Sequence, residues 1–144
     1  MTSCPYKKIL VPFDGSEGSR KALEKAMEIA SSDEAEVTAL WVDEDVPRYA
    51  PGVGMVEERF EVRAEEFEQI DAQVRELSKL GGKSIKTDCV VGHAAQSILR
   101  HAQENGFDII VIGHSGRSGV WGALLGSTTA RVVDHAICDV LVVR

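Results

Sequence analysis

Residues 107–136 read FDIIVIGHSGRSGVWGALLGSTTARVVDHA, and this stretch decides the fold of the chain. Its first six residues form a short apolar, β-branched run of the kind that fills a buried parallel strand. A glycine-rich segment follows, and beyond it the spacing of Ala130, Val132, Val133 and Ala136 predicts a helix. A strand therefore leads through glycines into the start of a helix.

A glycine-rich loop in this position is suited to an anion, because glycine lets the backbone approach a ligand and adopt positive φ. The helix start adds unpaired amides and a partial positive charge. The loop lacks the Gly-Lys-Ser/Thr ending of a Walker loop and the G-x-G-x-x-G spacing of the dinucleotide fingerprint. The residues alone leave two interpretations open, a phosphate-binding loop and a mobile surface loop.

The rest of the chain repeats this alternation of apolar strand patterns and amphipathic helix patterns. The patterns place strands at 7–13, 35–42, 83–91, 107–112 and 140–143, and helices at 17–31, 56–80, 94–104 and 128–136. Alternation of this kind predicts an α/β fold with a parallel sheet covered by helices on both faces. Right-handed crossovers limit the topology to a few doubly wound arrangements, and the patterns alone do not choose among them.

The segment 43–54, between the second strand and the longest helix, contains two prolines and two glycines. At about a dozen residues it is longer than the usual connection of roughly 4–6 residues. It is either a solvent-exposed connector or a flap over a ligand at the end of the second strand.

Composition and charge narrow the class of protein. With 44% hydrophobic and 27% charged residues, the 144-residue chain is expected to form one globular domain over residues 1–144. A net charge of −7 without a basic stripe argues against nucleic acid and anionic membrane surfaces as partners. No apolar run approaches the roughly 20 residues that span a bilayer, and residues 1–7 are too short and polar for a signal peptide. The predicted location is the cytoplasm.

The three cysteines, Cys4, Cys89 and Cys138, have no paired spacing. Cys89 and Cys138 lie in apolar strand contexts, so we expect both to be small core residues. A zinc site is not expected, because the sequence has no C-x-x-C and no spaced Cys/His set.

Three stretches together resemble the universal stress protein family, in its ATP-binding branch. Residues 8–16 read KILVPFDGS, and residues 135–143 read HAICDVLVV. Between them, residues 113–127 match the family pattern G-x2-G-x9-G-(S/T). The resemblance covers nearly the whole chain, and the combination is far more specific than any one of its pieces.

The resemblance implies a three-layer α/β/α fold of the doubly wound, adenine nucleotide alpha-hydrolase-like type. Its five-stranded parallel sheet would have the strand order 3-2-1-4-5. The winding then reverses between the first and fourth strands, where ligands bind at the carboxyl ends of such sheets. The segments 12–16 and 113–128 would bracket that crevice.

The resemblance further implies ATP in the crevice, with AMP or ADP as alternatives. Backbone amides and a serine hydroxyl would wrap the triphosphate. These groups belong to Gly113, Gly116, Gly126, Ser127 and Thr128. Arg117 either offsets phosphate charge or points into solvent. Because the loop contains no lysine, we expect Mg²⁺, held mainly by phosphate oxygens and water.

Ribose and adenine would lie at the other end of the crevice. Asp14 would accept a hydrogen bond from a ribose hydroxyl, or else it serves only to form the turn or cap the helix that follows. Pro12, Phe13 and Val42 would line the adenine slot, and Ile112 would pack beneath the sugar and base. Each of these apolar residues can equally be plain core.

Family membership implies a nucleotide-dependent regulatory protein of the stress response. Turnover of ATP is left open, with little or none expected, because the glycine loop has no neighbouring carboxylate and no obvious base apart from His114. The alternatives are a slow ATPase or phosphate-transfer enzyme, a dimer that has lost its ligand and only binds proteins, and a flavin- or adenylate-binding domain.

A homodimer is expected through Val140–Val143, since an exposed edge strand invites pairing and members of the family commonly dimerise there. Asp139 stands where the family usually has proline, a departure that can weaken or shift the pairing. The protein partner that would read the nucleotide state is not identified by the sequence.

Overall fold

The structure is a computed structural model that describes residues 4–30, 34–44, 54–115 and 124–144, and for residues 54–62 it describes the backbone alone. Its strands are β1 (Lys8–Pro12), β2 (Glu36–Asp43), β3 (Ile85–Val91), β4 (Ile109–Gly113) and β5 (Asp139–Val143). Its helices are α1 (Glu17–Ile29), α2 (Gly54–Gly81), α3 (Ala94–Glu104) and α4 (Ser127–His135). Each element lies where the sequence pattern predicts it, and each end falls within about two residues of the predicted end, the usual scatter of such boundaries.

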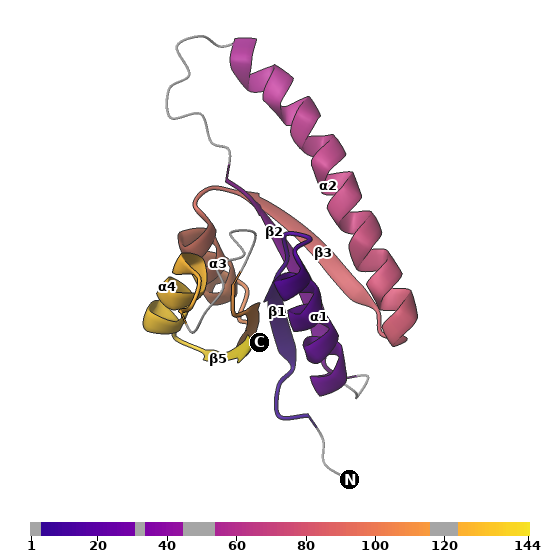
Figure 1. The fold of residues 1–144 in the computed structure, drawn as a ribbon, viewed down its shortest axis with the longest axis vertical. Helices are drawn as coiled ribbons and strands as arrows, with labels where there is room; N and C mark the ends of the chain where they lie inside the picture. Colours follow the sequence, from indigo (N-terminus) through magenta and orange to yellow (C-terminus); the bar gives the residue numbers. More distant parts are fainter. Residues whose placement is uncertain (1–3, 31–33, 45–53, 116–123) are drawn as a thin grey trace.

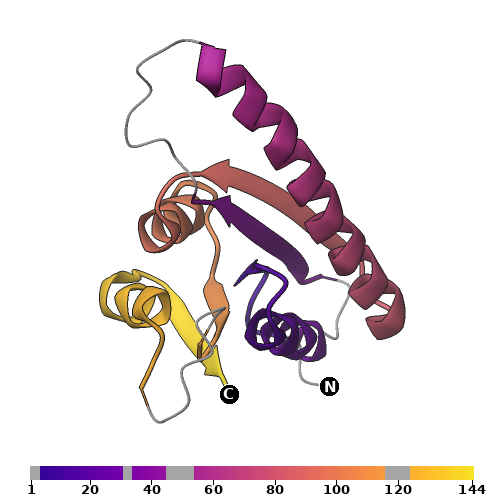
Figure 2. The same cartoon turned by 45° about the horizontal axis from the view of Figure 1, so that its top comes forward.

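All five strands run parallel in one sheet of order β3-β2-β1-β4-β5, which confirms the expected order. α1 and α2 cover one face of the sheet, and α3 and α4 cover the other (Figure 1 and Figure 2). The three-layer α/β/α fold is therefore confirmed. The direction of winding reverses between β1 and β4, so the carboxyl ends of these two strands meet where a doubly wound sheet binds its ligands.

Neighbouring residues of β1 point to opposite faces of the sheet and build both cores. Ile9 and Val11 pack with α1 and α2, whereas Leu10 packs with α3 and α4. All three side chains are fully buried. The strand reads as a continuous apolar run because helices cover both of its faces.

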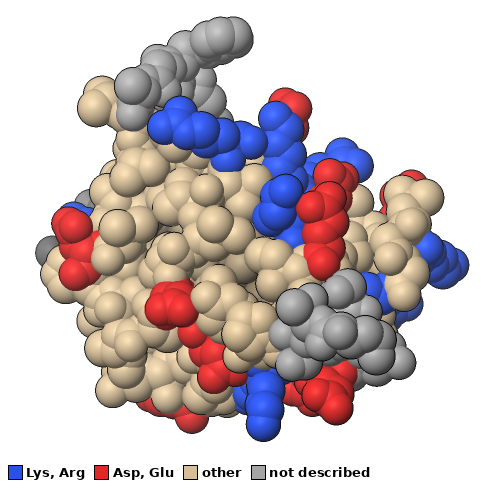
Figure 3. All heavy atoms as spheres, turned by 90° about the horizontal axis from the view of Figure 1, so that it is seen from below, with Lys and Arg blue, Asp and Glu red and all other residues tan. Residues whose placement is uncertain are grey.

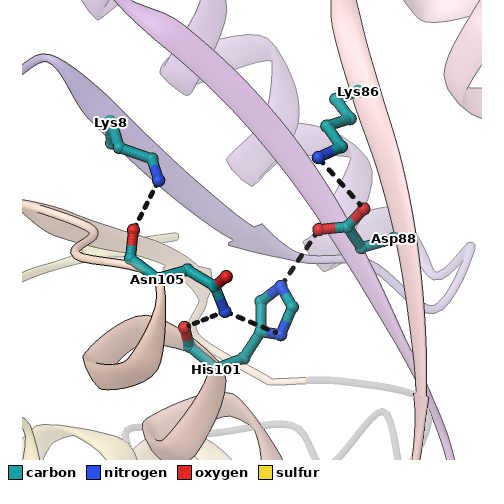
Figure 4. Close-up of polar contacts among 5 residues, drawn as sticks. All are labelled: Lys8, Lys86, Asp88, His101 and Asn105. Atoms are coloured by element: carbon teal, nitrogen blue, oxygen red, sulfur yellow. Dashed lines mark hydrogen bonds and ion pairs between the residues drawn. The ribbon is translucent and has the colours of Figure 1, made fainter.

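A polar network fixes the C-terminal part of α3 to the sheet (Figure 4). His101 of α3 contacts Asp88 of β3, with 3.0 Å between Nε2 and Oδ2, and Lys86 lies 3.9 Å from the same carboxylate. The Asn105 side-chain amide donates to the His101 carbonyl at 2.9 Å, and the Lys8 ammonium of β1 donates to the Asn105 carbonyl. Contacts from two strands thus set the position of α3, whose first residue lies at the carboxyl ends of the strands.

One of the expected core cysteines is not in the core. Cys138 is partly buried against α3 and α4, but Cys89 is exposed, so the prediction for Cys89 is wrong. Cys89 lies on β3, which is an edge strand flanked by β2 on one side only. An apolar strand pattern does not distinguish an edge strand from an inner one, and this is why the sequence misplaced the residue.

The face at the amino ends of the strands carries charges of both signs. In Figure 3, which views this face from below, Lys and Arg side chains gather along one side with Asp and Glu directly beside them. Positive charge on this face is therefore interrupted by negative charge. Within the described segments, no helix combines the length and hydrophobicity needed to cross a membrane.

Candidate functional site

A cleft of about 230 Å³ opens at the carboxyl ends of the strands, at the point where the winding reverses. Nine of the predicted site residues line it. They are Pro12, Phe13, Asp14, Val42, Ile112, Gly113, Gly126, Ser127 and Thr128. The other two, Gly116 and Arg117, lie outside the described residues, as does most of the segment 43–54. The cleft brings together the end of β1, the end of β2 and both ends of the glycine motif.

Gly113, the last residue of β4, packs directly against the first turn of α1. A Cβ on Gly113 would lie 2.8 Å from the carbonyl carbon and oxygen of Gly18, and a Cβ on Gly18 would lie 2.3 Å from the carbonyl oxygen of Ser115. The close approach of these two backbones, rather than of a ligand, is what requires glycine at both positions. Gly126 has φ of −57°, a value that any residue adopts, so its backbone conformation does not by itself require glycine.

Hydrogen bonds join the two ends of the glycine motif. The Gly126 amide donates to the His114 carbonyl at 2.9 Å, and the His114 amide donates to the Val143 carbonyl at 2.8 Å. The buried Thr129 hydroxyl donates to the Gly113 carbonyl, also at 2.8 Å. The start of α4 is thereby held beside the end of β4, where it forms one wall of the cleft.

Three helices begin at the cleft, and they differ in how their first amides are satisfied. At α1, the Ser16 hydroxyl accepts from the Ser19 amide at 3.2 Å. At α3, the Glu44 carboxylate accepts from the Ala94 amide at 3.1 Å. At α4 the N-cap residue is Gly126, and within the described part of the chain no side chain caps this helix. The first amides of a helix have no partner inside the helix, so the start of α4 keeps the capacity to bind an anion.

Asp14 forms the turn that connects β1 to α1. Its Oδ1 accepts from the Ser16 amide at 2.9 Å, and its own amide donates to the Ser19 hydroxyl at 3.3 Å. Asp14 therefore takes part in the turn, and its hydrogen bond to a ribose hydroxyl stays a prediction. Because Asp14 also lines the cleft, the turn places a carboxylate beside whatever the cleft holds.

β2 extends beyond β1 and turns main-chain groups toward the cleft. The Leu40 carbonyl accepts from the Phe13 amide, on the β1 side, and the Asp43 carbonyl accepts from the Gly92 amide, on the β3 side. In a strand, the amide and the carbonyl of one residue point to the same side of the strand. Those of the next residue point to the opposite side. The amide and carbonyl of Val42 consequently point to the β1 side, at a level where β1 has already ended, so they face the cleft that Val42 lines.

The comparison with known proteins agrees with this geometry. The model of the universal stress protein family matches residues 5–144. The chain belongs to this family. It is 36% identical over 140 residues to universal stress protein MJ0531 of Methanocaldococcus jannaschii, a match that covers 96% of this chain and 82% of that protein.

Solved universal stress proteins share the fold. Universal stress protein UspA from Lactobacillus plantarum matches with a TM-score of 0.83 and 31% identity, over 96% of this chain and 98% of that one. A universal stress protein crystallised in complex with cAMP matches with a TM-score of 0.74 and 25% identity, over 99% of each chain. The similarity extends over the whole sheet and its helices, including the elements that form the cleft.

The cleft of this universal stress protein has further lining residues that the sequence analysis did not single out. They are Ser16, Ser19, Leu40, Glu44, Ala94, Ile98, Ser115 and Thr129. Period-two alternation could have found Leu40 beside Val42, and helical spacing could have found Ile98 four residues after Ala94. Glu44 belongs to the segment 43–54, for which a flap over the ligand is one of two interpretations, but its contact with the start of α3 has no signal in the sequence because the two residues are 50 positions apart.

The charge of the cleft is uneven. Among the described lining residues, the ionisable side chains are the carboxylates of Asp14 and Glu44, and no lysine, arginine or histidine contributes. The described residues also contain no group of three His, Cys, Asp or Glu side chains that could hold a metal ion. Positive potential for a bound anion therefore comes, in this part of the chain, from backbone amides and hydroxyl groups at the start of α4.

Proposed function

We propose that this universal stress protein binds ATP in the cleft and acts, as a homodimer, as a nucleotide-dependent regulator in the stress response. The observation that carries the proposal is the uncapped start of α4, which forms one wall of a cleft whose opposite wall presents the main chain of Val42. The relative crystallised with cAMP, at 25% identity, supports an adenine nucleotide as the ligand. Cytoplasmic location remains a part of this proposal.

The phosphates bind at the start of α4. The amides of its first turn and the hydroxyls of Ser127 and Thr128 donate to phosphate oxygens, in the manner of other anion sites at helix ends. The Glu44 carboxylate accepts from the first amide of α3, and the Ser16 hydroxyl accepts from the third amide of α1. These two acceptors leave α4 as the helix end that accepts the charged part of the ligand.

The base binds at the end of β2. The Val42 amide donates to N1 of adenine, and the Val42 carbonyl accepts from the 6-amino group. Phe13 and Ile112 supply apolar contact to the purine and the sugar. Asp14, held by its turn, accepts from a ribose hydroxyl. Adenine fits this donor–acceptor pair, because its ring nitrogen accepts and its amino group donates.

Mg²⁺ accompanies the nucleotide as a partner of the phosphates. The described residues contain no group of three His, Cys, Asp or Glu side chains that could hold the ion, so hydroxyl groups and water would complete its coordination beside the phosphates. Mg²⁺ commonly keeps several waters and binds through substrate phosphates. It would reduce the charge of the triphosphate in a protein that carries a net charge of −7.

The dimer forms through the edge strand β5. The Val143 carbonyl accepts from the His114 amide on the β4 side, so by alternation the amides and carbonyls of Val140 and Val142 point away from β4. An edge with unpaired main-chain groups is a template for a second strand. A second copy of this chain would satisfy these groups, and a further protein would read the state of the nucleotide.

Isothermal titration of the purified protein with ATP, ADP and AMP, with and without Mg²⁺, tests the proposal. We expect saturable binding of one adenine nucleotide per chain, and mass spectrometry of small molecules released from the protein should find the same ligand. Absence of binding up to millimolar ATP would favour the interaction-only dimer. Release of phosphate far above that of a cleft variant would favour the slow ATPase, and a yellow protein would favour a flavin.

A further inference from the structure

Glu44 forms a hydrogen bond with the start of α3, a helix whose own N-cap residue does not cap it with its side chain. The residue follows β2 directly, and its Oε1 accepts from the Ala94 amide at 3.1 Å. The N-cap residue of α3, His93, makes no side-chain cap, and the first turn of α3 contains no acidic residue. The carboxylate of Glu44, an exposed residue directly after β2, takes over this role and is attracted by the partial positive charge of the helix start.

The sheet order places Glu44 at one end of the cleft and the glycine motif at the other. β2 and β4 flank β1 on opposite sides, Glu44 follows β2, and Gly113 ends β4. Glu44 also follows Val42 by two residues, so both side chains lie on the α3 face of the sheet. Because a carboxylate repels phosphate, the end of the cleft that contains Glu44 is suited to the uncharged base of a nucleotide.

We propose that Glu44 selects the base, by accepting a hydrogen bond from the exocyclic amino group of a 6-aminopurine. The inference rests on the proposed function and adds to it a residue that discriminates between purines. A 6-amino group has two N–H bonds; the Val42 carbonyl accepts one, and Oε2 of Glu44 accepts the other. A 6-oxopurine such as hypoxanthine would present an oxygen to the carboxylate oxygen, and the two acceptors repel each other.

The exchange Glu44→Gln tests this pairing with little change of shape. The side-chain oxygen of glutamine keeps the hydrogen bond to the Ala94 amide, which leaves the NH₂ group in the place of Oε2. The group facing the base is then a donor, which opposes the amino group of ATP and suits the oxygen of ITP. We expect the ratio of Kd for ITP to Kd for ATP to fall about tenfold or more, the size expected for loss of a hydrogen bond to a charged group.

Glu36→Gln is the matched control, because Glu36 is an exposed residue at the opposite end of the same strand. It removes the same charge and should leave the Kd ratio unchanged. Glu44→Ala, which removes both the cap and the acceptor, should also lower the ratio. Thermal melts of all variants report any loss of the α3 cap separately from binding.

The outcomes separate the two proposals. If the wild-type protein binds ATP, and the ratio in Glu44→Gln equals that of the wild type, Glu44 is only the cap of α3 and the inference is overturned while the proposed function stands. The inference is overturned in the same way if the exchange weakens the binding of ATP and of ITP by one common factor. If the wild-type protein binds neither ATP nor ITP, the proposed function fails and the inference fails with it.

Discussion

Replacing Gly126 by aspartate should abolish nucleotide binding without harming the fold. Gly126 is the N-cap of α4, and its dihedral angles, φ −57° and ψ 151°, are open to any L-residue. Aspartate is among the best N-cap residues, and its carboxylate would accept from the amides of Thr128 or Thr129, at the second and third positions of the helix. The variant thus carries its own anion at the site where we place the phosphates.

The two expected effects have opposite signs and can be estimated separately. The new cap, its favourable interaction with the helix dipole and the smaller entropy of the unfolded chain should together stabilise the fold by about 1 kcal/mol. That corresponds to a rise in Tm of roughly 2–4 °C for a domain of this size. Loss of two amide donors to phosphate, at about 1.5 kcal/mol or more each, should weaken ATP binding at least ~100-fold, before repulsion between carboxylate and phosphate is added.

Isothermal titration and thermal unfolding on the same preparations measure both effects. Gly126→Asn is the matched control, since asparagine caps a helix nearly as well but adds no charge. It should gain the cap but not the interaction of a charge with the helix dipole, so it should be slightly less stable than the aspartate variant and retain more of the binding. If Gly126→Asp is stable and binds ATP within about threefold of the wild type, the start of α4 is not the phosphate site and the reasoning from the three helix ends is refuted.

Three further predictions concern other parts of the chain. Gly18→Ala should destabilise the fold by about 1–3 kcal/mol, because the new Cβ would lie 2.3 Å from the Ser115 carbonyl oxygen. This cost should exceed the gain from the better helix propensity of alanine. Urea unfolding measures the effect, and unchanged stability would refute the close approach. Hydrogen bonds from the amides of residues 7 and 8 lower the pKa of Asp108, so this carboxylate stabilises the fold above about pH 4 and the contribution is lost as pH falls through the lowered value. Asp108→Asn should therefore cost under about 1 kcal/mol at pH 7, discounted because the residue is exposed, and the difference from wild type should vanish in acid. Val142→Pro removes an amide that points away from β4 and so removes a donor from the proposed dimer interface. Light scattering should show a monomer for this variant and a dimer for the control Val142→Ala. A dimeric proline variant would exclude β5 as the interface.

The sequence predicted the helices and strands well because each of them has its own local spacing of apolar residues. The apolar run before Gly113 and the apolar run at β1 are both continuous, because these strands are buried on both faces, and such strands have a composition that few other structures share. The order of strands depends on which edges pair, and that information came from resemblance to a family instead of from the residues themselves. The error at Cys89 came from its apolar strand pattern, because the expected strand order already placed β3 at an edge of the sheet.

The sequence predicted the site residues that belong to a local motif. It missed the contacts between elements that are far apart in the sequence. Ser127 and Thr128 follow a motif that the sequence displays, so their place in the cleft could be anticipated. The contact of Glu44 with α3 and that of Gly113 with Gly18 join elements far apart in sequence. No local pattern records such a contact, and for Gly113 the pattern suggested a different physical reason for the same glycine.

Under the proposed function, the arrangement of helix ends would let an acidic protein hold a polyanion without a cluster of basic side chains in the described lining. Three of the described helices begin at one cleft, and at two of them a side chain accepts from an amide of the first turn: the Ser16 hydroxyl at α1 and the Glu44 carboxylate at α3. The Glu44 carboxylate caps α3 and would also repel a phosphate at that end. It would therefore determine in which orientation a nucleotide binds. Under the proposed function, a ligand with a charged end and a base that forms hydrogen bonds would satisfy both the start of α4 and the main chain of Val42, and a nucleotide is such a ligand.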